Sequence, residues 1–76
     1  MQTKTEDLVA MARLRDWCRS GTAKAIRVGA DVTLDEVSAA CDVSPSAVSL
    51  WERGKRTARG ENALAYLRVL EGLMGR

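Results

Sequence analysis

A dense group of cationic side chains lies between residues 53 and 59 and is the part of the chain best suited to bind an anion. This segment contains no acidic residue, and its four basic residues are Arg53, Lys55, Arg56 and Arg59. The net charge of the whole chain is only +2. The local concentration of charge, and not the total, therefore indicates a polyanionic partner such as nucleic acid.

The chain offers no set of residues typical of an enzyme or a metal site. It has no histidine, and its two cysteines, Cys18 and Cys41, are 23 positions apart. This pattern excludes the usual Cys/His zinc spacings and favours two buried thiols. The sequence also lacks a glycine-rich phosphate-binding loop. We therefore expect no catalytic activity, no cofactor and no small-molecule ligand.

The bulk composition is that of one small globular domain, residues 1–76. Hydrophobic residues make up 46% of the chain and charged residues 29%, and phenylalanine is absent. No apolar stretch approaches the roughly 18 residues that a membrane span needs. The N-terminus lacks the pattern of a signal peptide, so we expect a cytoplasmic protein that does not contact a membrane.

The residues just before the cationic group predict a short helix over residues 34–40 that ends in a sharp turn. Thr33 can cap the free amides at the start of this helix, and Glu36 completes a capping box. Val37 and the alanine or cysteine that follows it at positions 40–41 recur at helical spacing. Asp42 tolerates a left-handed backbone, so the chain can reverse direction there.

A second helix is predicted over residues 45–53. Ser44 is a good N-terminal cap, and Pro45 suits the first helical position because its missing N–H needs no partner there. Val48 and Trp51 share one face of this helix and are expected to be buried. A glycine ends the helix and the basic residues follow at once.

The segment from residue 33 to residue 55 resembles the helix-turn-helix of the Cro and lambda-repressor-like family of DNA-binding regulators. The residues that carry the resemblance are Thr33, Glu36, Val37, Ser38, Val43, Ser44, Val48, Ser49 and the run from Trp51 to Lys55. Two positions depart from the family pattern. Leu34 stands where the family usually has glutamine, and Leu50 stands where a polar or basic residue is frequent.

The resemblance implies an all-α fold, a compact lambda-repressor-like DNA-binding domain of five to six helices with an extra N-terminal helix. The helices expected outside the motif cover residues 6–19, 21–29 and 61–74. For the N-terminal helix we expect a cap at Thr3 or Thr5 and a core anchor at Trp17. Ser20 is expected to cap the helix that follows.

The closing helix, 61–74, has an apolar arc wider than one core contact needs. The residues expected to seal the core are Ala63, Leu67, Leu70 and Met74. Tyr66, Val69 and Leu73 extend the arc toward a second face. This second face could form a homodimer or could be partly buried against the N-terminal helix, and the sequence does not decide between the two.

By the same resemblance, double-stranded DNA is the expected partner and the 45–53 helix enters its major groove. The residues expected to face the bases are Pro45, Ser46, Ala47, Ser49, Leu50 and Arg53. The residues expected at phosphates or the minor groove are Thr33, Ser44, Lys55, Arg56 and Arg59. Arg27 is expected to form a structural ion pair with Glu52, although a phosphate contact is the alternative.

The function that the resemblance implies is that of a phage- or prokaryote-encoded repressor that binds operator half-sites. The low net charge and the two leucines at usual contact positions support another interpretation. In that alternative the helix-turn-helix is a protein-docking or antitoxin-like module with weak or indirect DNA binding.

Overall fold

The computed structural model describes the chain from residue 2 to residue 75, with side chains described from residue 5 onward, and all regular structure in that part is helical. The helices are α1 (Gln2–Ser20), α2 (Thr22–Gly29), α3 (Leu34–Cys41), α4 (Pro45–Glu52) and α5 (Gly60–Met74). The expected all-α fold is therefore confirmed. Within residues 2–75, no helix is both long enough and apolar enough to span a membrane.

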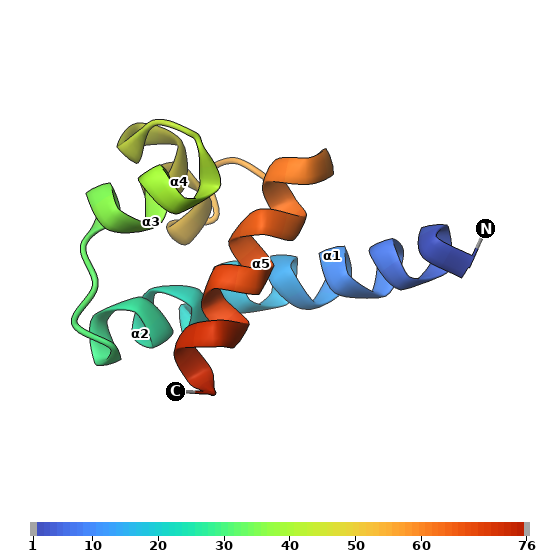
Figure 1. Cartoon of the computed structure of the whole chain (residues 1–76), viewed down its shortest axis with the longest axis horizontal. Coiled ribbons are helices and arrows are strands. Elements are labelled where there is room, and N and C mark those ends of the chain that lie inside the picture. The colour runs from blue at the N-terminus through green and yellow to red at the C-terminus, as the bar shows by residue number, and fades with distance from the viewer. Residues whose placement is uncertain (1, 76) are drawn as a thin grey trace.

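Helix α5 organises the arrangement of the other helices. It packs against α1, α2 and α3, and it crosses α1 at a steep angle (Figure 1). Helices α3 and α4 form an angled pair at one end of the molecule, while the N-terminal half of α1 projects past α5 on the opposite side. The longest dimension, 36 Å, follows from this projection.

The core lies where the α3–α4 pair meets α5. Val37 of α3, Val48 of α4 and Tyr66 and Leu70 of α5 are its largest fully buried side chains. The ring of Trp51 lies 5.1 Å from the ring of Tyr66, at an interplanar angle of 40°. This distance and tilt are typical of favourable aromatic packing. The inner face of α4 is therefore anchored on α5.

Helix α1 differs from the sequence expectation at its start and in its anchor. It begins at Gln2, so positions 3 and 5, which were expected to cap it, lie inside the helix. Leu14 is its buried core residue, whereas Trp17 is only partly buried. Toward the N-terminus Leu8 and Val9 are exposed, because the projecting half of α1 has little to pack against.

The junction between α1 and α2 depends on a glycine. Gly21 adopts a left-handed backbone with φ of +87° and occupies the cap position of α2. Ser20, which was expected in that role, is instead the last residue of α1. Its hydroxyl oxygen still accepts a long hydrogen bond, 3.4 Å, from the N–H of Thr22.

Helix α5 buries a different set of residues from the one predicted. Ala63, Leu67 and Leu70 are buried as expected, but Met74 is 58% exposed because the last turn of α5 extends past α1. Tyr66 is completely buried against Trp51, so it cannot belong to a dimer surface and its assignment there was wrong.

Candidate nucleic-acid interface

Side chains of the first turn form hydrogen bonds with the backbone N–H groups at the N-terminus of α3. The N–H of Thr33 donates to Glu36 Oε1 at 2.8 Å, and the N–H of Glu36 donates to Thr33 Oγ1 at 3.1 Å. These two bonds form the predicted capping box. The Thr33 hydroxyl donates to the same carboxylate oxygen at 3.2 Å. Asp35 adds a second negative charge to this first turn.

The turn between α3 and α4 is a Schellman motif with aspartate at the left-handed position. Asp42 has φ of +58°. The N–H of Val43 donates to the Ser38 carbonyl at 3.0 Å, and the N–H of Asp42 donates to the Ala39 carbonyl at 3.3 Å. Val43 packs against the core, and Ser38 is buried. Local backbone bonds and one apolar contact therefore fix the angle between the two helices.

Helix α4 begins with a cap that adds no negative charge. Ser44 Oγ accepts the N–H of Ala47 at 3.2 Å, and Pro45 occupies the first helical position. The first turn contains no acidic residue. Val48 and Trp51 are buried, so the opposite side of α4 faces outward. The positive end of the α4 dipole is consequently open to a negatively charged partner.

The six residues predicted to face the bases divide between two grooves. The groove between α3 and α4 is lined by Leu34, Pro45, Ser46, Ser49, Leu50 and Arg53. Ala47 lies on the other flank of α4, in a groove shared with Val43, Trp51, Arg56, Thr57, Ala58, Arg59 and Asn62. The structure thus brings five of the six together and separates Ala47 from them.

An ion pair holds the far end of α4. Arg27 Nε donates to Glu52 Oε2, and Arg27 Nη2 donates to Glu52 Oε1 at 3.2 Å. Arg27 Nη1 donates to the Val32 carbonyl at 2.8 Å. The two charged side chains are only 12% and 4% exposed, and the hydrogen bond to Glu52 raises the pKa of Arg27 above its ordinary value. Arg27 is therefore occupied by protein groups, and it connects α2 and the α2–α3 connection to α4.

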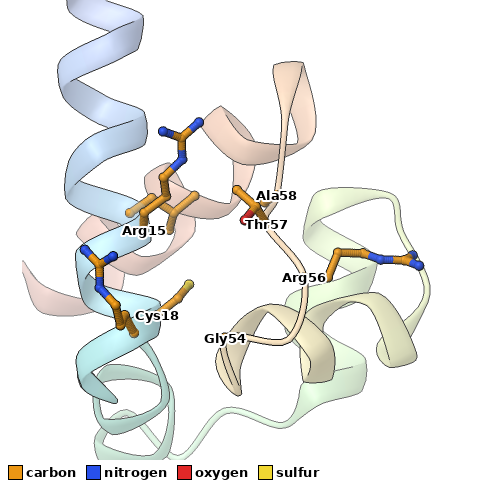
Figure 2. Close-up of a pocket in the computed structure, with 8 residues that line it drawn as sticks. Arg15, Cys18, Gly54, Arg56, Thr57 and Ala58 are labelled. Carbon is orange, nitrogen blue, oxygen red and sulfur yellow. The ribbon is translucent and has the colours of Figure 1, made fainter.

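A second Schellman motif fixes the cationic loop to the end of α4. Gly54 has φ of +69°, and its N–H donates to the Trp51 carbonyl at 3.0 Å. The N–H of Lys55 donates to the Leu50 carbonyl at 2.9 Å, and the N–H of Arg56 donates to the same carbonyl at 3.3 Å. The side chains of Lys55, Arg56 and Arg59 are exposed, and Arg56 points away from α1 (Figure 2).

Two polar residues of this region were missed by the sequence prediction. Thr57 and Asn62 line the groove beside α4 together with Arg56 and Arg59. Their only sequence signal is that they adjoin the cationic run, since a loop has no periodicity that would show which side chains face outward. Asn62 can both donate and accept hydrogen bonds, whereas the arginine side chains can only donate them.

The two cysteines carry free thiols in different environments. Burial, followed by repulsion from the Glu52 carboxylate, raises the pKa of Cys18 to about 11. Burial also raises the pKa of Cys41. Both thiols are consequently protonated near neutral pH. The described residues also contain no group of His, Cys, Asp or Glu side chains that could hold a metal ion.

The comparison with known families agrees with this geometry. Residues 24–72, nearly two-thirds of the chain, match the model of the family described as Helix-turn-helix. The chain therefore belongs to the helix-turn-helix family of the lambda-repressor and Cro type. It is, accordingly, a DNA-binding regulator of this family. No curated protein and no solved structure matches the chain. The matched segment includes the α3–α4 motif and leaves α1 outside.

Proposed function

We propose that the protein is a sequence-specific repressor that binds double-stranded DNA with α4 in the major groove. The observation that carries the proposal is the outward face of α4, where serine hydroxyls and apolar groups are bounded by a cationic loop. The Schellman turn at Gly54 fixes the loop to the end of α4. A base-contacting surface and phosphate-contacting cations are thus held in one rigid unit.

The chemistry of the α4 face favours small polar and methyl contacts. It carries no Arg, Gln or Asn before Arg53, so it offers no bidentate hydrogen bonds to guanine or adenine from its centre. Ser46 and Ser49 can each form a hydrogen bond with a base edge. Leu34 and Leu50 line the same groove and could contact thymine methyl groups. Specificity would then come from these contacts and from DNA shape.

Phosphate contacts are proposed at the loop and at the start of α4. Lys55, Arg56 and Arg59 supply exposed cations. At the start of α3, by contrast, the N–H of Thr33 already donates to a carboxylate. A phosphate there would have to displace a negatively charged group. We therefore place the helix-end contact at Ser44 in preference to Thr33.

Dimerisation on DNA would supply the specificity that one small domain lacks. Related regulators bind paired half-sites about 34 Å apart, one helical turn of DNA. With Tyr66 buried, the proposed dimer face consists of the half-buried Val69 and Leu73 and the exposed Met74 in the C-terminal part of α5. A dimer bound to an operator would repress by blocking polymerase. Sedimentation of the protein with and without a duplex measures the number of copies bound.

Substitution of Arg56 tests the DNA-binding proposal directly. Arg56→Ala should weaken binding to specific and random duplexes alike and reduce the slope of log K against log salt by about one unit, because one phosphate contact is lost. Gel-shift titrations at several salt concentrations measure both quantities. Arg68→Ala is the matched control, since Arg68 is exposed on α5 in a groove that also contains Glu6, Asp7 and Glu71. Unchanged binding by Arg56→Ala would remove the loop from the interface.

A protein-docking module is the second candidate, and one observation favours it. Leu34, Pro45 and Leu50 give the groove between α3 and α4 an apolar lining, and the two leucines stand where the family usually has a polar or basic residue. An apolar groove can accept a protein segment as well as a base methyl group. The same titrations separate the candidates, because a docking module would produce no saturable, salt-sensitive shift of the duplex.

A further inference from the structure

Helix α1 carries two arginines that line a cavity next to the loop after α4 and lie outside the segment matched to the family. A cavity of about 150 Å³ separates the C-terminal half of α1 from this loop (Figure 2). Arg15 and Arg19 line it on the α1 side, and Arg56 and Thr57 line it on the loop side. None of the described residues that line the cavity carries a carboxylate.

The local geometry places the cations at the edges of the cavity. Arg15 and Arg19 are four residues apart and therefore lie on one face of α1. The Cys18 side chain points toward the loop, whereas Arg15 extends away from Cys18 and Arg56 points away from α1 (Figure 2). The guanidinium groups of Arg15 and Arg56 thus extend away from the cavity and are available to an anion outside it.

Other arginines of the same region have structural partners. Arg13 pairs with Glu71 at 3.0 Å, and Arg27 pairs with Glu52. For Arg15 and Arg56, the described residues provide no carboxylate partner. The contact of Arg19 with Asp16 is 3.6 Å long, and both of its side chains are more than 70% exposed. Such an exposed pair is weak and is readily exchanged for another anion.

We propose that Arg15 and Arg19 bind the sugar-phosphate backbone of DNA, so that the contact made by the loop continues onto α1. The inference rests on the proposed function. Its support is that Arg56 lines both this cavity and the groove beside α4. A DNA backbone that contacts Arg56 beside α4 would reach Arg15 and Arg19 by continuing across the cavity. The N-terminal helix α1 then contributes to the affinity for DNA as well as to the stability of the fold.

The first test is the salt dependence of DNA binding by the double variant Arg15→Ala/Arg19→Ala. Loss of two phosphate contacts should make the slope of log K against log salt shallower by about two units. Arg68→Ala, which removes one exposed arginine from the groove between α1 and α5, should leave the slope unchanged. A wild-type slope in the double variant overturns the inference and leaves the proposed function standing. If the wild-type protein itself shows no salt-sensitive binding, the proposed function fails, and this inference fails with it.

The second test measures the alkylation rate of Cys18 in the wild-type protein, so it does not depend on whether a variant folds. Cys41 is buried in the core, so Cys18 is the thiol that a small alkylating reagent reaches in the folded wild-type protein. Because the pKa of Cys18 is about 11, the rate should be measured at mildly alkaline pH. A saturating duplex should slow the alkylation of Cys18 severalfold by covering the cavity. An alkylation rate unchanged by the duplex would show that DNA does not reach α1, and the inference would be wrong.

Discussion

The two helices of the motif, α3 and α4, are equal in length but differ in the charge and hydrogen bonding of their N-terminal turns. Each has 8 residues, and each begins with a hydroxyl side chain that caps a backbone amide. The first turn of α3 carries Asp35 and Glu36, and Glu36 occupies the N–H of Thr33. The first turn of α4 has no acidic residue, and its outward side carries serine, proline and leucine side chains.

This difference indicates that the two helices have different roles, α3 in structure and α4 in recognition. The closed, negatively charged start of α3 suits a structural element whose role is to position its neighbour. The open start of α4, with cations fixed to its other end, suits a surface that contacts a polyanion. The contrast predicts that mutations in α3 and at the anchors act on stability, and that mutations on the outer side of α4 act on recognition.

Loss of the Arg27–Glu52 ion pair at the end of α4 should have the largest effect, and this effect is on the free energy of unfolding. Glu52→Ala leaves the guanidinium of Arg27 nearly buried without a carboxylate, which should lower the free energy of unfolding by about 3–5 kcal/mol. The matched control is Glu71→Ala, which breaks the half-exposed Arg13–Glu71 pair and should cost less than about 1 kcal/mol. Denaturant unfolding measures both values. Equal losses in the two variants would mean that the buried pair does not hold α4.

Removal of one hydroxyl from the outer side of α4 should change recognition and leave stability nearly unchanged. Ser46→Ala should reduce the preference at one or two base pairs by roughly 1 kcal/mol or more, since one hydrogen bond to a base edge is lost. Competition titrations with single-base-pair variants of a selected site measure the preference. Ser20→Ala, at the exposed junction of α1 and α2, should have no such effect. An unchanged preference in Ser46→Ala would place Ser46 away from the bases.

The negative charge at the start of α3 can be removed without removing its cap. In Glu36→Gln the amide oxygen can still accept the N–H of Thr33, so the fold should be retained. Affinity for duplex DNA should rise about two- to fivefold, because a carboxylate near the helix end no longer repels phosphate. Glu61→Gln in the first turn of α5 is the control with the same charge change. Equal effects of the two substitutions would show that charge alone matters, without regard to position.

The features of the motif that could be predicted from the sequence are those fixed by neighbouring residues. The capping box of Thr33 and Glu36 and the left-handed conformation of Asp42 are both confirmed. Each depends on contacts within about five positions along the chain, where residue type and spacing are sufficient. The all-α fold is also confirmed, since helical periodicity and the family resemblance point the same way.

The features that could not be predicted depend on which helix faces meet. Tyr66 and Met74 both lie on the apolar arc of α5, yet Tyr66 is fully buried and Met74 is exposed. Their difference follows from where α4 and α1 cross α5, which periodicity does not contain. The cavity that Arg15 and Arg56 both line joins residues far apart in sequence, so no local pattern indicates it.

The smallest predicted effect concerns the opposite ends of the same two helices. Both α3 and α4 end in Schellman turns, with Asp42 at φ of +58° in the first and Gly54 at φ of +69° in the second. A left-handed backbone is strained for a residue with a Cβ atom, so Asp42→Gly should raise the free energy of unfolding by about 0.5 kcal/mol. Asp16→Gly, the same exchange inside α1, should instead destabilise by a few tenths of a kcal/mol, because glycine is a poor helix former. Denaturant midpoints measure both. If Asp42→Gly were destabilising, the Asp42 side chain would itself be stabilising the turn. The C-terminal ends of α3 and α4 would then have similar backbones but different sources of stability.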